Sequence, residues 1–419
     1  MSAAPQNLTQ AALDGYNRRW WIVILLALAC IIAYIDRVNL SFAIIDGDFK
    51  NFFQIDNTQR GFLNSAFFWS YAALQIPAGW LVDRYGSKYP LAISFAVWSA
   101  LTAIAAATTG YWALFAVRLL LGVGEAAMHP ASMRWIRFNF PESQRGFAIG
   151  LFMSGSKFGP AIGAIASAWL IESHGWRAMF LIMGAAGILW LIPFLLVTPN
   201  DSATGAAKTP EPAATAIPIG KLVLNPILLG TIIGTFAYMY FVYFCLTWMP
   251  AYLSEARGLS LSSSGLFTTF SFAGMATVAI IAGWVADRII AAGHDSVTVR
   301  KAFTIAGFIL ASSEFLSASA PSPELAIAIS IVSLSGLGLA TANYWALTQT
   351  LFPSGSVGRI VGIQNCAASV AGILAPVITG WLVQNTGGYA AAMNAVLFFL
   401  VAGIVAYLFL VRKKYAYQA

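Results

Sequence analysis

The chain has 419 residues, of which 59% are hydrophobic and only 9% charged, and its mean hydropathy is +0.75. This composition excludes a water-soluble globular protein and indicates an integral membrane protein. The net charge of +7 does not call for a nucleic-acid partner, because membrane proteins collect Lys and Arg in the loops of one side.

A membrane-spanning helix needs about 20 mainly apolar residues to cross a hydrocarbon layer about 30 Å thick. Twelve runs of the sequence qualify when Pro and Gly are allowed to interrupt them. The predicted spans are 20–45, 60–82, 89–108, 111–134, 145–171, 177–197, 225–253, 262–290, 301–320, 324–350, 356–384 and 387–412. Most Lys and Arg residues outside these spans fall on the side of the N-terminus, which predicts an all-α, multi-pass protein with both termini in the cytoplasm.

A polar linker and a repeated loop signature divide the chain. Residues 198–224 are rich in Pro, Ala and Thr and separate six spans from six, which predicts six-helix bundles over 1–197 and 225–419. The signature "GWLVDRYGSK" at 79–88 returns as "GWVADRIIAAG" at 283–293. Duplication of a six-helix unit is typical of transporters that work by alternating access.

The two copies of this signature match the loop motif of the major facilitator superfamily, and the chain resembles that superfamily over essentially its whole length. The resemblance implies a major facilitator fold of twelve transmembrane helices in two halves. Small residues let helices approach, and basic residues hold a loop at the inner membrane surface. The motif residues expected to act in the conformational change are Gly79, Asp83, Arg84, Gly86, Lys88, Gly283, Asp287 and Arg288.

Charged side chains inside a span cost at least about 2.5 kcal/mol to insert, so each calls for a partner or a function. Leaving aside the charged residues at the loop ends of the predicted spans, we single out Asp36, Arg37, Arg118, Glu125, Lys157 and Glu314. Helical spacing puts Tyr34 and Arg37 on one stripe and Asp36 on the next, and one further helical face carries Arg118, Glu125 and His129. Two interpretations stay open: structural ion pairs, or a path for substrate and protons.

Three segments resemble the anion:cation symporter family, which includes bacterial galactonate, glucarate and hexuronate transporters and the animal sialin. They are "YIDRVNLS" at 34–41, "RLLLGVGEAAMHPA" at 118–131 and "RFNFPESQRGFAIG" at 137–150. The resemblance implies an organic-anion substrate and assigns proton titration to Asp36 and Glu125, beside which we place Arg118 and His129.

The same resemblance implies a carboxylate-binding role for Arg37 and further substrate contacts. The other predicted substrate-binding residues are Tyr34, Tyr71, Lys157, Trp345, Asn365 and Gln364. Lys157 departs from the galactonate-type pattern, which has a neutral polar residue at or beside this point. It could bind a second carboxylate or compensate the charge of Glu125, and both alternatives stay open.

We therefore expect a proton-coupled symporter of the bacterial inner membrane that imports a sugar acid, such as an aldonate or hexuronate, and acts as a monomer. The alternative is an organic-anion exchanger or exporter, suggested by the glycines and proline of "GSKFGPAIG", which close helix packing would also explain. The three Cys and three His show no metal-ligand spacing, so we expect no metal, cofactor or enzymatic activity. Glu314 is expected to reach the membrane interface at the outer end of its span.

Overall fold

A computed structural model describes residues 10–199, 225–352 and 354–415, in which all regular structure is helical. The first part of the chain forms α1 (Gln10–Ala43), α2 (Gly47–Phe53), α3 (Asn57–Tyr85), α4 (Lys88–Ala105), α5 (Tyr111–Glu125), α6 (Met128–Asn139) and α7 (Glu142–Val197). The second part forms α9 (Pro226–Thr247), α10 (Met249–Ala251), a π-helical turn (Tyr252–Ala256), α11 (Leu261–Ala291), α12 (Ser296–Ser312), α13 (Glu314–Ser317), α14 (Pro323–Leu351), α15 (Ser354–Thr386), α16 (Ala390–Phe409) and a 3-10 turn (Lys413–Tyr415).

Nine helices in the described ranges are long and apolar enough to cross a membrane. One of these regions, Gln144–Val197, breaks at Gly175, whose φ of 83° and ψ of 164° are not helical, so it contributes two helices. The remaining long helices are α3, with 29 residues, and α12, with 17. Together they give twelve spanning helices, the number that the sequence predicts.

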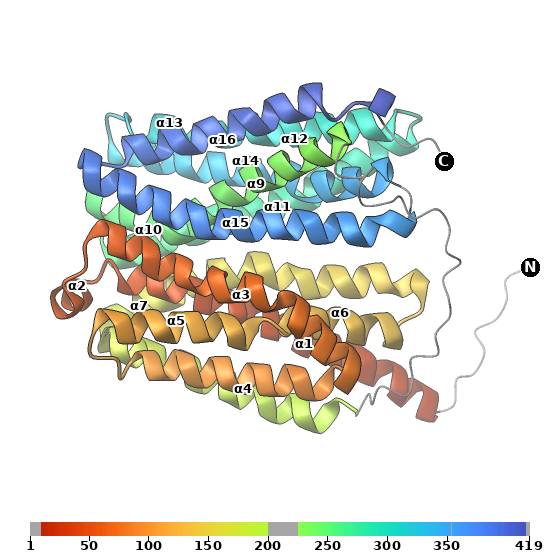
Figure 1. Cartoon of the computed structure of the whole chain (residues 1–419), viewed down its shortest axis with the longest axis horizontal. Coiled ribbons are helices and arrows are strands. Elements are labelled where there is room, and N and C mark those ends of the chain that lie inside the picture. Colours follow the sequence, from red (N-terminus) through yellow and green to blue (C-terminus); the bar gives the residue numbers. More distant parts are fainter. Residues whose placement is uncertain (1–9, 200–224, 353, 416–419) are drawn as a thin grey trace, which may run out of the picture.

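The helices pack as two halves, one made of α1–α7 and the other of α9–α16 (Figure 1). In the first half α1 and α4 pack against α7, and α3 packs against α5; in the second, α11 and α12 pack against α14, and α15 and α16 pack against α9. The linker residues 200–224 lie outside the described residues, so the domain limits at 197 and 225 stay a prediction.

Glycines on α7 bring α1 close to it. A Cβ atom on Gly155 would lie 2.7 Å from the carbonyl oxygen of Ala27, and one on Gly159 would lie 2.5 Å from Cβ of Tyr34. Neither position leaves room for a larger residue. The glycines of "GSKFGPAIG" therefore serve close helix packing, which places Tyr34 beside the α7 backbone.

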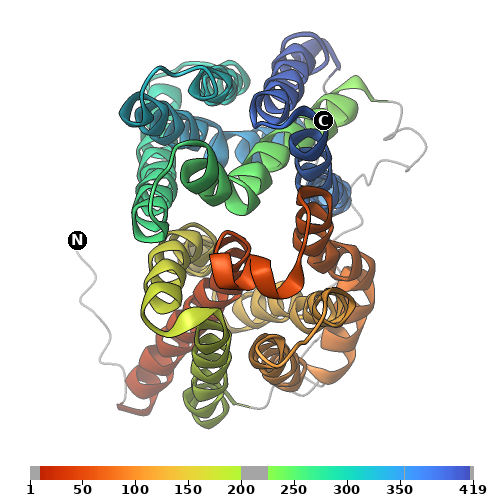
Figure 2. The same cartoon turned by 90° about the vertical axis from the view of Figure 1, so that its left-hand side faces the viewer.

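The halves meet along two lines, α3 with α15 and α7 with α11, which Figure 2 shows end-on. The backbone N–H of Asn57 donates to Oε1 of Gln384 at 3.0 Å, and that of Ser262 to Oε1 of Glu172 at 2.7 Å. These contacts lie at the end of the molecule that carries α2 and α10, which we call the α2 end; the opposite end, near both described chain ends, is the termini end. The two halves are thus joined at the α2 end.

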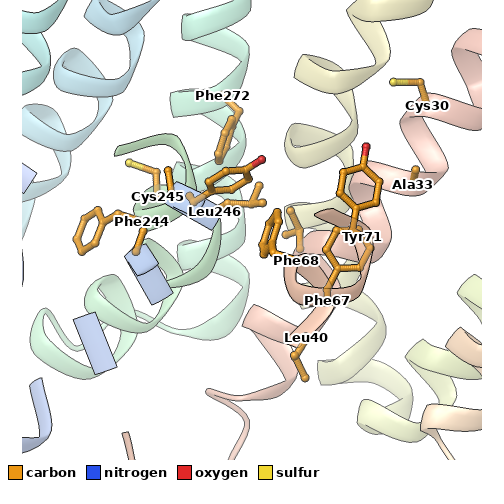
Figure 3. Packing of buried hydrophobic residues seen from close by; sticks show 14 of the residues in the cluster. Cys30, Ala33, Leu40, Phe67, Phe68, Tyr71, Phe244, Cys245, Leu246 and Phe272 are labelled. Carbon is orange, nitrogen blue, oxygen red and sulfur yellow. The ribbon is translucent and has the colours of Figure 1, made fainter. Parts of the chain in front are cut away.

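Aromatic side chains fill the junction of the halves deeper in the molecule. The ring of Phe68 on α3 lies 4.5 Å from that of Tyr243 on α9, centroid to centroid, in an edge-to-face arrangement. Figure 3 shows the α3 residues Phe67, Phe68 and Tyr71 on one side and Leu246 on the other. This apolar seal separates the α2 end from the space beyond it.

Candidate functional site

A cavity of about 970 Å³ lies between the two halves. The predicted substrate or proton residues that line it are Tyr34, Arg37, Tyr71, His129, Lys157, Trp345 and Asn365. A Cβ atom on Gly150, which also lines the cavity, would have nothing within 4 Å, and the same holds for Gly362 on α15. The lining also includes Gly283, which belongs to the loop signature at the termini end, so the cavity extends toward that end.

Arg37 of α1 lies in an aromatic cage and is paired with a buried acid. The centre of its guanidinium lies 4.5 Å from the ring of Tyr34, 4.7 Å from Phe67 and 4.9 Å from Tyr71. Its Nη2 and Nε donate to Oε2 of Glu125 at 2.8 and 3.1 Å, which leaves Nη1 outside the ion pair. The cage fixes the plane of the guanidinium beside the cavity.

Glu125 is fully buried at the end of α5 and uses only one of its two carboxylate oxygens for Arg37. Its Oε1 is buried without a hydrogen-bond partner among the described residues. A buried polar atom without a partner is costly unless something else binds there. Oε1 could accept a proton without breaking an existing hydrogen bond.

Asp36 points away from Arg37 and the cavity, because adjacent residues of a helix diverge by about 100°. Its Oδ1 accepts from Nδ2 of Asn39 at 3.1 Å, and its backbone carbonyl accepts from Nη1 of Arg118 at 3.2 Å. Asp36 and Arg118 are 1% and 3% exposed, and neither is among the residues that line the cavity. With Arg37 and Glu125 they form a buried cluster of two positive and two negative groups.

His129 lies apart from that cluster. The predicted span 111–134 lies within one membrane-spanning stretch, Tyr111–Asn139, in which a short turn at Ala126 and Ala127 separates α5 from α6. From α6, Nδ1 of His129 lies 3.3 Å from the hydroxyl of Tyr71, and both side chains line the cavity. The turn brings His129 to the cavity wall, whereas Arg118 and Glu125 stay buried.

Lys157 reaches from α7 across the cavity to the other half. Its Nζ donates to the hydroxyl of Tyr238 on α9 at 3.4 Å, and that hydroxyl also shares a hydrogen bond of 2.8 Å with Oγ1 of Thr341. Among the residues that the structure describes, Lys157 has no carboxylate within ion-pair distance. Its charge is therefore not balanced as that of Arg37 is.

The second half contributes Trp345 from α14 and Asn365 from α15 to the cavity. Gln364 does not line it: the side chain is fully buried, and Nε2 donates to Oγ1 of Thr235 at 3.2 Å and of Thr348 at 3.0 Å. Adjacent residues of a helix point in different directions, so only one of the two predicted α15 residues, Asn365, faces the cavity.

Residues 26–376 match the family model described as the Major Facilitator Superfamily. The chain belongs to this superfamily. It is thus a multi-pass membrane protein of a transporter family and not an enzyme.

Relatives of known or assigned function align over nearly the whole chain. A probable galactarate/D-glucarate transporter of Bacillus subtilis is 32% identical over 94% of this chain and 92% of its own length. A D-galactonate transporter of Escherichia coli is 29% identical over 94% and 96%, and a hexuronate transporter of B. subtilis is 29% identical over 91% and 90%. This member of the Major Facilitator Superfamily thus resembles the sugar-acid transporters that its sequence motifs indicate.

The same fold is found in a solved bacterial homologue of the human lysosomal transporter Spinster, in an inward-facing and unoccupied conformation. The TM-score is 0.77 at 18% identity, and the match covers 96% of this chain and 99% of that one. At this identity the likeness concerns the fold. It agrees with the all-helical, two-half architecture of Figure 1.

The aspartate of each loop signature of this superfamily member, at the termini end, forms an ion pair with an arginine outside the signature. Oδ1 of Asp83 lies 3.6 Å from Nε of Arg134 on α6, and Oδ1 of Asp287 lies 2.8 Å from Nη2 of Arg300 on α12. Asp83 and Asp287 are mostly exposed, so these ion pairs are weak. Each ion pair joins two helices within one half.

The other signature residues shape the same loops. Arg84 lies over the ring of Trp80 at 5.4 Å, and Arg288 over Trp284 at 4.8 Å. Gly86 ends α3 with a φ of 83°, a conformation that favours glycine. The remaining members are Lys88, which begins α4 and lies 5.9 Å from the ring of Tyr89, Gly79, which has open space around it, and Gly283, which faces Ala342.

Glu314 does not reach the membrane interface, and the expectation that it does is wrong. The residue is fully buried, and its carboxylate accepts from Oγ of Ser330 at 2.9 Å and of Ser333 at 2.7 Å. The reason is the break between α12 and α13 at Ser313, which turns Glu314 toward α14. These hydrogen bonds satisfy the buried carboxylate within the second half.

Sequence reasoning missed a cluster of charged and polar side chains at the α2 end, which we call the clasp: Lys50, Arg60, Glu255 and Tyr389. Oε1 of Glu255 lies 3.1 Å from Nη1 of Arg60 and also pairs with Lys50, and its Oε2 accepts from the hydroxyl of Tyr389 at 2.8 Å. Burial alone would raise the pKa of Glu255, but Arg60 and Lys50 outweigh it and hold that pKa below its usual range. Lys50 and Arg60 belong to one half and Glu255 to the other, so the clasp joins the halves.

Sequence reasoning also missed the cavity residues Gln75 and Tyr344. Gln75 lies one helical turn beyond Tyr71 on α3 and lines the cavity with it, a spacing that could have identified it. Tyr344 lines the cavity from α14, with its ring centroid 4.7 Å from that of the cavity residue Tyr238 on α9. Nothing in its local sequence separates Tyr344 from the tyrosines of ordinary helix packing.

Proposed function

We propose that the chain is a proton-coupled symporter that imports a sugar acid across the bacterial inner membrane, with the α2 end outside and both termini in the cytoplasm. The relatives named as sugar-acid transporters support the substrate class. The observation that carries the mechanism is the ion pair between Arg37 at the cavity and the buried Glu125. Protons and one small organic anion are the partners, in a lipid bilayer.

A proton on Glu125 makes Arg37 available to the substrate. The carboxylate of Glu125 occupies Nη2 and Nε, which are the donors that a guanidinium presents to a carboxylate in a bidentate arrangement. When Glu125 is neutral, the charge-charge attraction is lost, and a substrate carboxylate in the cavity can take its place. Substrate binding and proton binding then favour one another.

Asp36 supplies a second proton site. The buried cluster of Asp36, Arg37, Arg118 and Glu125 is electrically neutral, so a proton on either acid leaves it with one positive charge. In a medium of low dielectric constant that charge attracts an anion strongly. If more than one proton accompanies a monovalent anion, inward transport gains about 2.3 kcal/mol per net charge per 100 mV.

The hydroxyl-rich body of a sugar acid needs polar and aromatic surfaces around the carboxylate site. Tyr34 and Tyr71 beside Arg37, with Trp345 and Asn365 across the cavity, provide them from both halves. Because these contacts come from both halves, a bound substrate can favour a rearrangement of the two halves around it. The clasp holds the outside closed until that rearrangement opens it.

Uptake into proteoliposomes tests the proposal. An inward proton gradient should drive accumulation of labelled galactonate, glucuronate or galactarate with no substrate inside, and a protonophore should stop it. Accumulation that needs internal substrate would instead indicate the exchanger, and accumulation driven by an outward-directed proton gradient would indicate an exporter. Close packing against α1 accounts for Gly155 and Gly159 without an exchange mechanism.

A further inference from the structure

The wall of the cavity carries more positive charge than a single carboxylate needs. Its described lining residues include two permanent cations, Arg37 and Lys157, and no Asp or Glu. Arg37 is balanced from behind by Glu125, whereas the Lys157 ammonium contacts a neutral hydroxyl. Once Glu125 is protonated the cavity presents two positive charges.

Lys157 does not compensate the charge of Glu125. That carboxylate is bound to Arg37, and no ion pair joins it to Lys157 among the described residues. The Lys157 side chain extends instead to Tyr238 in the other half. Of the two roles that the sequence leaves open for this lysine, the geometry favours an anion in the cavity.

The two cations enter the cavity from different levels. Gly155 packs against Cys30 and Gly159 against Tyr34, so the backbone of residue 157 lies level with the part of α1 between them. From that level to the backbone of Arg37 is about five residues, or roughly 7.5 Å along the helix axis. The two side chains therefore start from separate places on the cavity wall, and each can meet a different part of one small molecule.

We propose that Lys157 binds the second carboxylate of a six-carbon sugar diacid, so that the cavity selects aldarates over aldonates and hexuronates. The proposal rests on the proposed function, in which Arg37 binds the first carboxylate. A flexible ammonium donates to a carboxylate from several directions, which suits a substrate whose second end must adjust. The carboxylate would replace the hydroxyl of Tyr238, which is also bonded to Thr341, as the partner of the Lys157 ammonium.

Galactarate and galactonate make a matched pair of ligands, because they share the carbon skeleton and differ only in the second terminal carboxylate. Calorimetry on the purified protein should give galactarate about tenfold tighter binding or more. Lys157→Gln should remove this preference by weakening galactarate about tenfold while galactonate changes less than about threefold. Lys157→Arg should keep the preference, since it keeps the charge.

Tyr238→Phe is the control, because it removes the hydrogen-bond partner of Lys157 but not the ammonium. It should keep the preference for galactarate. Equal binding of the two ligands by the unaltered protein, or an equal loss of both in Lys157→Gln, would overturn the proposal and leave the proposed function standing. Failure of every sugar acid to bind the unaltered protein would overturn the proposed function as well.

Discussion

Nη2 of Arg37 lies 2.8 Å from Oε2 of Glu125, and this ion pair separates the substrate cavity from the buried charges behind it. Arg37 is a cavity residue, whereas Glu125 has no exposed surface. One side chain can therefore meet the substrate while its partner responds to protons.

Arg37→Ala should lower sugar-acid affinity by about 100-fold or more, because it removes a charge-assisted bidentate contact. Arg37→Lys should restore little, since an ammonium cannot form that contact. Calorimetry with galactarate and galactonate measures both variants. Unaltered binding in Arg37→Ala would refute the carboxylate-binding role.

Glu125→Gln and Asp36→Asn should keep substrate binding and lose accumulation driven by a proton gradient, because neither amide titrates. Exchange of labelled for unlabelled substrate across proteoliposomes should continue, since it needs no net proton movement. Continued gradient-driven accumulation in both variants would exclude these acids as the coupling sites. Thermal unfolding in detergent checks that the buried Arg37, deprived of its charged partner, does not unfold the protein.

Glu255→Gln should open the α2 end, because the amide loses the ion pairs with Arg60 and Lys50. Low pH should act in the same direction. A carboxyl whose pKa is lowered in the closed state stabilises that state above its ordinary pKa, and the stabilisation is lost as pH falls through the lowered value.

Spin labels at two exposed positions of the α2 end, Asp48→Cys and Asn385→Cys, measure this opening in a chain whose exposed Cys366 is replaced by Ala. The distance between them should lengthen as the pH falls from neutral through the lowered pKa of Glu255. In Glu255→Gln it should already be long at neutral pH. An unchanged distance in the variant would show that the clasp does not hold the halves together.

Gly159→Ala should destabilise the protein by about 1–3 kcal/mol, because its Cβ would lie 2.5 Å from Cβ of Tyr34. It should also weaken substrate binding, since Tyr34 is part of the cage around Arg37. Gly150→Ala is the matched control, with nothing within 4 Å of the added Cβ. Thermal unfolding of the two variants compares them, and equal stability would contradict the packing argument.

Much of the fold could be predicted from the sequence because lipid restricts the choice of structure to apolar helices of a fixed length. The repeated loop signature added the two-half arrangement. Helix breaks were harder to place. The turn at Ala126 and Ala127 is marked in the sequence by Pro130, which has no N–H to donate to the carbonyl of Ala126. The break at Ser313, which moved Glu314 from its expected surroundings, has no such mark.

The sequence could predict those parts of the candidate site that depend on the spacing of residues along a single helix. The divergence of Asp36 from Arg37 follows from helical spacing alone. Contacts between helices could not be predicted in the same way: neither the pairing of Arg37 with Glu125 nor the clasp around Glu255 is visible before the chain is folded. The sequence also did not show which of two adjacent residues on α15 faces the cavity: Asn365 does, whereas Gln364 does not.

Proton uptake on substrate binding tests the account most directly. Calorimetric titrations in two buffers of different ionisation enthalpy count the protons that the protein takes up when a sugar acid binds. If the substrate displaces Glu125 from Arg37, the unaltered protein should take up at least about one proton and Glu125→Gln about one fewer. The same proton count in the two proteins would contradict the account.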